Sequence, residues 1–315
     1  MAKKEMTIAY KQSWFTTVAK DFKRNKWIYL LAVPAVLWYI IFCYKPMYGV
    51  LIAFKDFKGK EGILGSAWVG LEHFKTFFDS IYFERTFMNT IILNAYGILF
   101  GFPIPIILAL MMNELRNQKY KKLIQTTSYL PHFISLVVVC GMVLDFTSDH
   151  GFITSIVNSI TGENYYKLLE KKEFYRVIYI ASDIWQTAGW GSIIYLAALA
   201  GVDMSLYEAA KIDGAGKWKQ LWHVTIPGIM PTIVIMFILK VGSLMSIGAD
   251  KTILLYNELT YETSDIISSY VFRMGIGGGQ YSLSAAVGLF NSVINCILVL
   301  SANALSKKFT DSGLF

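Results

Sequence analysis

The chain has 315 residues, of which 55% are hydrophobic and only 16% are charged, and its formal net charge is +7. A soluble domain of this size carries about 25% charged residues, so the deficit predicts that much of the surface faces lipid. The lysines and arginines cluster beside apolar runs, as in membrane proteins, and we therefore expect no nucleic-acid partner. The three cysteines lie far apart without a CxxC pair, which argues against a disulfide framework and a zinc site.

Six apolar stretches are long enough to cross a hydrocarbon core ~30 Å thick, which requires about 20 mostly apolar residues. They cover residues 27–47, 86–112, 123–145, 174–200, 228–249 and 284–305. We therefore expect an all-α membrane protein with six transmembrane helices. One helical membrane domain, residues 27–305, would lie between an N-terminal segment, 1–26, and a short tail, 306–315.

The distribution of basic residues predicts the orientation of these spans. If the N-terminus is cytoplasmic, the cytoplasmic segments hold 16 basic and 7 acidic residues. The outer segments, 48–85, 146–173 and 250–283, carry more acidic than basic residues. Cytoplasmic loops are enriched in Lys and Arg, so both termini are expected in the cytoplasm of a multi-pass protein.

The fourth predicted span contains polar and aromatic residues among small ones, in the run SDIWQTAGWGSIIY. Polar groups inside a span usually face the bundle interior or a water-filled cavity. One hypothesis is that this face lines a translocation pathway through Asp183, Gln186, Trp190 and Tyr195. The alternative is that Trp185 and Trp190 anchor the helix at the outer interface and that Asp183 is in contact with water.

The loop 201–227, on the predicted cytoplasmic side, carries the most specific signal. Its LYEAAKID run predicts a short helix, which Ser205 can cap with Glu208 three residues later. Gly214 interrupts this helix, because glycine readily adopts the left-handed conformation that ends helices. A second short helix then continues until Pro227. We expect a helix–turn–helix with small side chains that allow a partner surface to approach closely.

The GAGK sequence in this loop does not encode an ATP site. A P-loop requires Gly at the position of Lys211 and Ser or Thr at the position of Trp218. No spacing of histidines or carboxylates suggests a metal or catalytic site, so we expect no cofactor and no enzymatic activity in this chain. ATP and Mg²⁺ would be used by a separate subunit.

The run EAAKIDGAGKWKQLWHVTIP, residues 208–227, resembles the EAA loop of ABC importer permeases. The matching positions include Val224 and Ile226, which are conservative departures from the usual aliphatic residues. Segments 46–57, 126–135 and 265–293 are similar to permeases of oligosaccharide and polysaccharide-fragment importers, a branch of the maltose-type group. In that family the loop forms coupling helices that bind the ATPase, which implies this role for Glu208, Ala209, Ala210, Asp213, Gly214, Ala215 and Pro227.

The resemblance also implies partners and a location. It implies ABC ATPase subunits, a second homologous permease, an extracytoplasmic solute-binding protein and an oligosaccharide substrate, in a bacterial cytoplasmic membrane. Some relatives are described as peptide or lipoprotein transporters, so a non-sugar solute is an alternative. An ion-driven secondary transporter is another, although no inverted repeat is evident. A membrane-bound transferase would need a clustered catalytic set, and none is evident.

Lys240 is an unusual residue within the fifth predicted span. A lysine buried there without a partner would be costly. We therefore expect that it pairs with an acidic group or faces an aqueous cavity.

Overall fold

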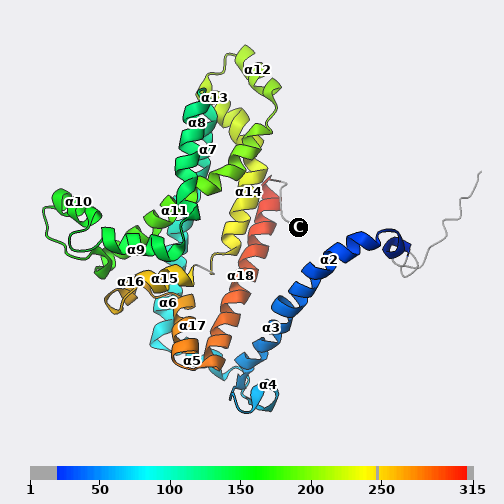
Figure 1. Cartoon of the computed structure of the whole chain (residues 1–315), viewed down its shortest axis with the longest axis vertical. Coiled ribbons are helices and arrows are strands. Elements are labelled where there is room, and N and C mark those ends of the chain that lie inside the picture. Colours follow the sequence, from blue (N-terminus) through cyan, green and yellow to red (C-terminus); the bar gives the residue numbers. More distant parts are fainter. Residues whose placement is uncertain (1–19, 246–247, 311–315) are drawn as a thin grey trace, which may run out of the picture. The chain divides into compact units, whose positions relative to one another are not determined.

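The computed structural model describes residues 20–245 and 248–310 (Figure 1). Helices make up most of the described residues, which confirms the predicted all-α class. Within the described residues there is one small sheet, in which β1 (Lys55–Asp56) pairs antiparallel with β2 (Ala67–Trp68). The chain divides into two compact units, residues 1–51 and 52–315.

The first unit holds an apolar helical segment that begins with α2 (Lys26–Trp38). The segment continues through the π-helix η1 (Tyr39–Tyr44), α3 (Lys45–Met47) and the 3₁₀-helix η2 (Tyr48–Phe54), which extends into the second unit. Its 29 residues are long and apolar enough to cross a bilayer. It matches the first predicted span and extends it at the C-terminal end.

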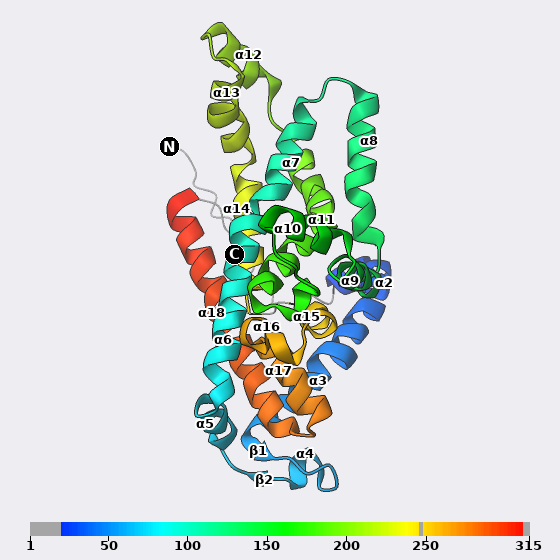
Figure 2. The same cartoon turned by 90° about the vertical axis from the view of Figure 1, so that its left-hand side faces the viewer.

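Four long helical rods run side by side in the second unit (Figures 1 and 2). The first is α6 (Ile81–Tyr96), which passes through the π-helix η3 (Gly97–Gly101) into α7 (Pro103–Glu114). The π-helical turn directly precedes the prolines at 103 and 105, where a disturbed helix is expected because proline cannot donate a backbone hydrogen bond. The other rods are α11 (Lys172–Ala200), α14 (Ile226–Gly242) and α18 (Tyr281–Thr310).

Four helices of the described chain are long and apolar enough to cross a membrane, and there are up to six if each of two bent pairs is one span. The predicted third span is one of the bent pairs and not a straight helix. It consists of α8 (Gln118–Tyr129), the 3₁₀-helix η4 (Leu130–Phe133) and α9 (Leu136–Phe146), bent by 98°. The bend lies between the end of α8 at Tyr129 and Ser135, which caps α9, and Pro131 is near the start of η4 between them.

The predicted fifth span is also shorter than expected, because α14 ends at Gly242 rather than at residue 249. Short helices follow it: α15 (Ala249–Leu255), η7 (Glu258–Thr260), α16 (Tyr261–Ser264), α17 (Ile267–Phe272) and η8 (Arg273–Gly277). The connecting segments contain α4 (Gly62–Gly65), α5 (Glu72–Phe78), α10 (Phe152–Thr161), η5 (Leu168–Glu170), α12 (Met204–Ile212), α13 (Lys217–Gln220) and η6 (Leu221–Thr225).

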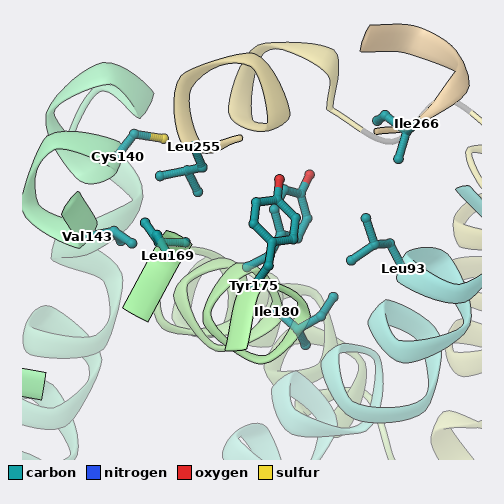
Figure 3. Packing of buried hydrophobic residues seen from close by; sticks show 9 residues of the cluster. Leu93, Cys140, Val143, Leu169, Tyr175, Ile180, Leu255 and Ile266 are labelled. Carbon is teal, nitrogen blue, oxygen red and sulfur yellow. The ribbon is translucent and has the colours of Figure 1, made fainter. Parts of the chain in front are cut away.

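A buried apolar cluster joins α6, α9 and α11 to the short helices that follow α14 (Figure 3). Tyr175 of α11 is completely buried at its centre. Around it lie Leu93, Cys140, Val143, Leu169, Tyr179, Ile180, Leu255 and Ile266. Burying such side chains stabilises by about 1.5–3 kcal/mol each, so this cluster fixes the position of α11 against the neighbouring helices.

A buried carboxylate fixes the turn between α16 and α17. Asp265 is completely buried, and its two oxygens accept hydrogen bonds from both Arg85 of α6 and Arg273 of η8 at 2.8–3.0 Å. Asn89 of α6 donates to the backbone oxygen of Asp265 at 3.0 Å. Two guanidinium groups and one amide therefore hold this turn against α6.

The predicted cytoplasmic loop and the small sheet lie at opposite ends of the second unit (Figure 2). The helices α12 and α13 extend beyond one end of the rods, beside the connection between α7 and α8. The strands and α5 lie at the other end. The loop 201–227 and the segment 48–85 were predicted to lie on opposite sides of the membrane, and they lie at opposite ends of this unit.

Candidate functional site

The loop 201–227 folds as a helix, a sharp turn and a second helix. The N-terminal cap of α12 is Asp203, whose Oδ1 accepts a hydrogen bond from the backbone N–H of Ser205 at 2.9 Å. The cap predicted at Ser205 was therefore wrong by two residues. The reason is local, since an aspartate carboxylate two residues earlier already satisfies the free backbone donor.

Gly214 ends α12 in the predicted manner. Its φ is +74°, a conformation that side chains with a Cβ rarely adopt. The backbone N–H of Ala215 donates to the oxygen of Ala210 at 2.8 Å, and that of Gly214 donates to the oxygen of Lys211 at 3.0 Å. These two bonds form a Schellman motif, which turns the chain sharply after Asp213.

Side-chain bonds tie this corner to the bundle. Gln220 donates to the backbone oxygen of Ala215 at 2.7 Å, and the hydroxyls of Tyr207 and Thr225 lie 2.9 Å apart. Lys217 forms an ion pair with Glu114 at the end of α7. The corner is therefore a defined structure attached to the rods.

The second helix of the loop does not end at Pro227. It runs from Lys217 through α13, η6 and α14 to Gly242 as one helical segment, with Pro227 near the start of α14. The π-helical turn η6 directly precedes this proline, and such a turn accommodates the missing backbone donor. The loop therefore continues without a break into a long rod.

The solvent-exposed surface of the loop is apolar at several positions. Ile212 is 87% exposed and Trp218 is 75% exposed. Glu208 and Asp213 are exposed beside them. The other large exposed apolar residues of the loop are Met204, Leu206 and Trp222. Clustered exposed apolar residues next to charged ones are typical of an interaction surface.

The structure separates the four residues predicted for the pathway. Gln186 donates to the backbone oxygen of Ile134 at 3.2 Å, and Trp190 stacks on His132 with ring centroids 4.6 Å apart. Both therefore contact the bend between α8 and α9. Tyr195 is 3% exposed and belongs to an apolar cluster with Ala109, Leu199 and Ile229, so it does not line a cavity in this structure.

Asp183, the fourth of these residues, does line a cavity of about 260 Å³. The cavity lies between α6, α11, α14 and the start of α15. Its polar lining residues come from all four segments. The lining residues are Leu93, Asn94, Gly97, Leu136, Tyr179, Ile180, Asp183, Lys240, Ser243, Gly248 and Lys251.

Lys251 neutralises Asp183 within this cavity. Its Nζ lies 2.9 Å from the backbone oxygen of Tyr179, 3.4 Å from Asp183 Oδ1 and 4.6 Å from the centre of the Tyr179 ring. Burial lowers the pKa of Lys251, and the Asp183 carboxylate opposes that shift. Sequence reasoning did not single out Lys251, because it follows the predicted end of a span in an outer segment.

Lys240 lines the same cavity from the last turn of α14. Its ammonium has no hydrogen bond or ion pair within residues 20–245 and 248–310. The expectation that Lys240 faces a cavity is therefore confirmed. The acidic residue of the lining, Asp183, is already in contact with Lys251.

The chain combines a bundle of long apolar helices, a cavity with polar lining residues and an exposed helix–turn–helix at one end. This architecture is typical of the membrane subunit of a transporter. Residues 101–311 match the binding-protein-dependent transport system inner membrane component family. The chain belongs to this family, which confirms the resemblance to ABC importer permeases.

Individual relatives match almost the whole chain. Protein LplB of Bacillus subtilis (strain 168) is 45% identical over 304 residues, which is 96% of this chain and 94% of LplB. The polygalacturonan/rhamnogalacturonan transport system permease protein YteP of the same organism is 43% identical and covers 93% of this chain and 91% of YteP.

A solved structure has the same fold. It is a chain of a bacterial ABC transporter involved in the import of the acidic polysaccharide alginate, with a TM-score of 0.86 and 41% identity over 93% of this chain and 99% of that one. A second structure shows a bacterial alginate ABC transporter in complex with an alginate pentasaccharide-bound periplasmic protein, also with a TM-score of 0.86.

Proposed function

We propose that this chain is the permease subunit of an ATP-driven importer of oligosaccharides or polysaccharide fragments. The observation that carries the proposal is the corner at Gly214, which exposes an apolar surface at one end of the bundle and continues directly into α14. Membership of a binding-protein-dependent transport family favours this function over an ion-driven transporter. The names of YteP and of the alginate transporters support a sugar substrate.

The loop would transmit movement from the ATPase subunits. Ala209 and Ala210 leave room for a partner surface, and Glu208 and Asp213 offer charged contacts. ATP and Mg²⁺ would be bound by the partner, since this loop lacks a P-loop sequence. When the ATPase dimer closes, the helical segment 217–242 would move with the loop, because no flexible linker separates them.

The opposite end of the bundle would receive the substrate from a solute-binding protein. A second homologous permease would complete the pathway, and both termini of this chain would be cytoplasmic. Within the pathway, the cavity around Asp183 and Asn94 offers carboxylate, amide and ammonium groups inside an apolar bundle. Polar groups placed in this way are typical of a substrate route.

The test is to isolate the chain with its ATPase and second permease and to reconstitute the complex in proteoliposomes. Uptake of oligosaccharides should require the binding protein on one side and ATP with Mg²⁺ on the other. Co-isolation of the ATPase should be lost when Trp218 and Ile212 are both replaced by Asp. Uptake of peptides but not sugars would show that the substrate is a peptide and not a sugar. Uptake driven by an ion gradient without ATP would refute the proposal.

A further inference from the structure

The helix α10 separates its apolar and polar side chains onto two faces. Successive residues of an α-helix are rotated by about 100°. This rotation places the five apolar residues of α10 within an arc of about 140° and the five polar ones on the rest of the circumference. The apolar residues are Phe152, Ile153, Ile156, Val157 and Ile160, and the polar residues are Thr154, Ser155, Asn158, Ser159 and Thr161. The helix is therefore amphipathic along its whole length, and it carries no charged residue.

The apolar face of α10 points away from the protein. Phe152 is 70% exposed and Ile160 is 80% exposed, whereas Thr154, on the polar face, is completely buried. Thr154 is also the one buried residue of this helix. A helix at a water-exposed surface has the reverse arrangement, because the burial of apolar side chains is what stabilises it. The apolar face therefore needs a cover that the described part of this chain does not supply.

The contacts of α10 fix its direction relative to α9. Gly151 lies between the two helices, and a Cβ added there would lie 2.2 Å from the backbone oxygen of Phe146. The side-chain amide of Asn158 donates to the backbone oxygen of Tyr165 and accepts from the backbone N–H of Tyr165, both at 2.9 Å. Figure 1 shows α10 beyond α9, on the side away from the rods. The exposed apolar face is therefore held in a defined place.

The polar face of α10 has few hydrogen-bonding groups left for a partner. The hydroxyls of Ser155, Ser159 and Thr161 donate to backbone oxygens four residues earlier, at 2.8–3.0 Å. Hydroxyls bonded in this way do not require water, which allows serine and threonine to lie beside an apolar phase. The helix also lacks a charge that could pair with a soluble protein. These properties favour lipid over a soluble partner.

The apolar face of α10 continues the exposed surface of α9. Val137, Val138 and Leu144 of α9 are exposed, and α9 belongs to one of the bent pairs that could cross a membrane. The 10 residues of α10 measure about 15 Å, which is about half of the ~30 Å hydrocarbon core. Tyr166, which is exposed just after α10, matches the aromatic residues enriched at membrane–water boundaries. The helix is too short to span the bilayer and is suited to lie along its surface.

We propose that α10 lies in the outer leaflet of the membrane, with its apolar face on the lipid acyl chains and its polar face toward the protein and water. The predicted orientation assigns the segment 146–173 to this side. Amphipathic helices of this kind bury their apolar face about 5–10 Å deep, at the boundary between headgroups and acyl chains. The helix would anchor the end of α9, and with it the bend between α8 and α9. This contact does not involve the transported substrate, so the inference goes beyond the proposed function.

The experiment compares labels on the two faces of α10 in the importer complex, reconstituted in phosphatidylcholine vesicles. Ile160→Cys places a label on the apolar face, and Ser155→Cys is the matched control on the polar face; both positions are exposed. Cys43 and Cys296 are replaced by alanine, and Cys140 is kept because it is buried. Each introduced cysteine carries a bimane fluorophore. The quenchers are a lipid with a spin label near its headgroup and iodide in the water.

We expect the spin-labelled lipid to quench the Ile160 label several-fold more than the Ser155 label, and iodide to show the opposite order. Addition of phosphatidylglycerol should leave both values unchanged, because α10 has no charge that could bind an anionic headgroup. Lipid quenching that required phosphatidylglycerol would assign the contact to the headgroups and overturn the proposed contact with acyl chains.

Two other results would also overturn the inference. Equal quenching of both labels by iodide, without quenching by lipid, would show that α10 lies in water. Protection of the Ile160 label from both quenchers would show that another protein chain covers the apolar face. The assay requires neither ATP nor sugar. Failure of sugar uptake would therefore refute the proposed function and leave this measurement unaffected.

Discussion

Trp190 of α11 lies flat on His132, with the ring planes 5° from parallel and the centroids 4.6 Å apart. Phe133 packs against the same indole edge-on, at 5.4 Å. With the bond from Gln186 to Ile134, these contacts attach the middle of α11 to the bend between α8 and α9. Two residues predicted to line the pathway therefore hold a bent segment in position.

This arrangement predicts the behaviour of Trp190 variants. Trp190→Ala should lower the free energy of unfolding by about 1 kcal/mol, since it removes the aromatic pair. Trp190→Phe should lower it by much less, because an aromatic ring is kept. The sugar concentration at half-maximal uptake should not change. Thermal unfolding in detergent and uptake assays measure the two effects. An increase in that sugar concentration, without a loss of stability, would instead place Trp190 in the pathway.

Gly214 provides a test of the coupling loop with a matched control. Gly214→Val places a β-branched residue at φ +74° and introduces about 1–3 kcal/mol of local strain. Transport should fall strongly although nothing lies within 4 Å of the added Cβ. Gly216→Val also meets nothing within 4 Å, and its φ of −70° suits any residue.

The measurement for this pair is ATP-driven uptake by complexes that contain equal amounts of ATPase. Gly216→Val should transport at a rate close to that of the wild type. Normal transport by Gly214→Val with the ATPase bound would remove the coupling role from this corner.

Gly189 marks a close approach of α11 to α8. A Cβ added there would lie 1.9 Å from the backbone oxygen of Ser128, so Gly189→Ala should destabilise by about 1–3 kcal/mol. Gly141 of α9 meets nothing within 4 Å, and Gly141→Ala should stabilise by up to about 1 kcal/mol. Opposite shifts of the unfolding temperature are expected, and shifts in the same direction would contradict the packing described.

Asp265 should be essential for the stability of the short helices that follow α14. Asp265→Asn removes the negative charge but leaves Arg85 and Arg273 facing each other, which should cost about 3–5 kcal/mol. Asp250→Asn, at an exposed site in α15, should cost little. Thermal unfolding compares the two variants. If Asp265→Asn were as stable as Asp250→Asn, the two arginines would not depend on the Asp265 carboxylate for their counter-charge.

The sequence by itself determined the features that depend on composition and on local conformation. Apolar length predicted the helical rods, because a bilayer requires long apolar helices. The corner at Gly214 was also predictable, since a glycine after a helical run ends the helix through its own backbone. The cap at Asp203 and the bend at Pro131 were local too, but competing signals nearby made their positions ambiguous.

Only the tertiary structure decided which side chains meet across the rods. Lys251 binds Asp183 across 68 positions of the chain, and Trp190 meets His132 across a bend that apolar periodicity does not reveal. Helix rotation and the end of α14 at Gly242 depend on packing of the whole bundle. For that reason Lys240 could be recognised as unusual from the sequence, while its place in the same cavity lining as Asp183 and Lys251 emerged only from the fold.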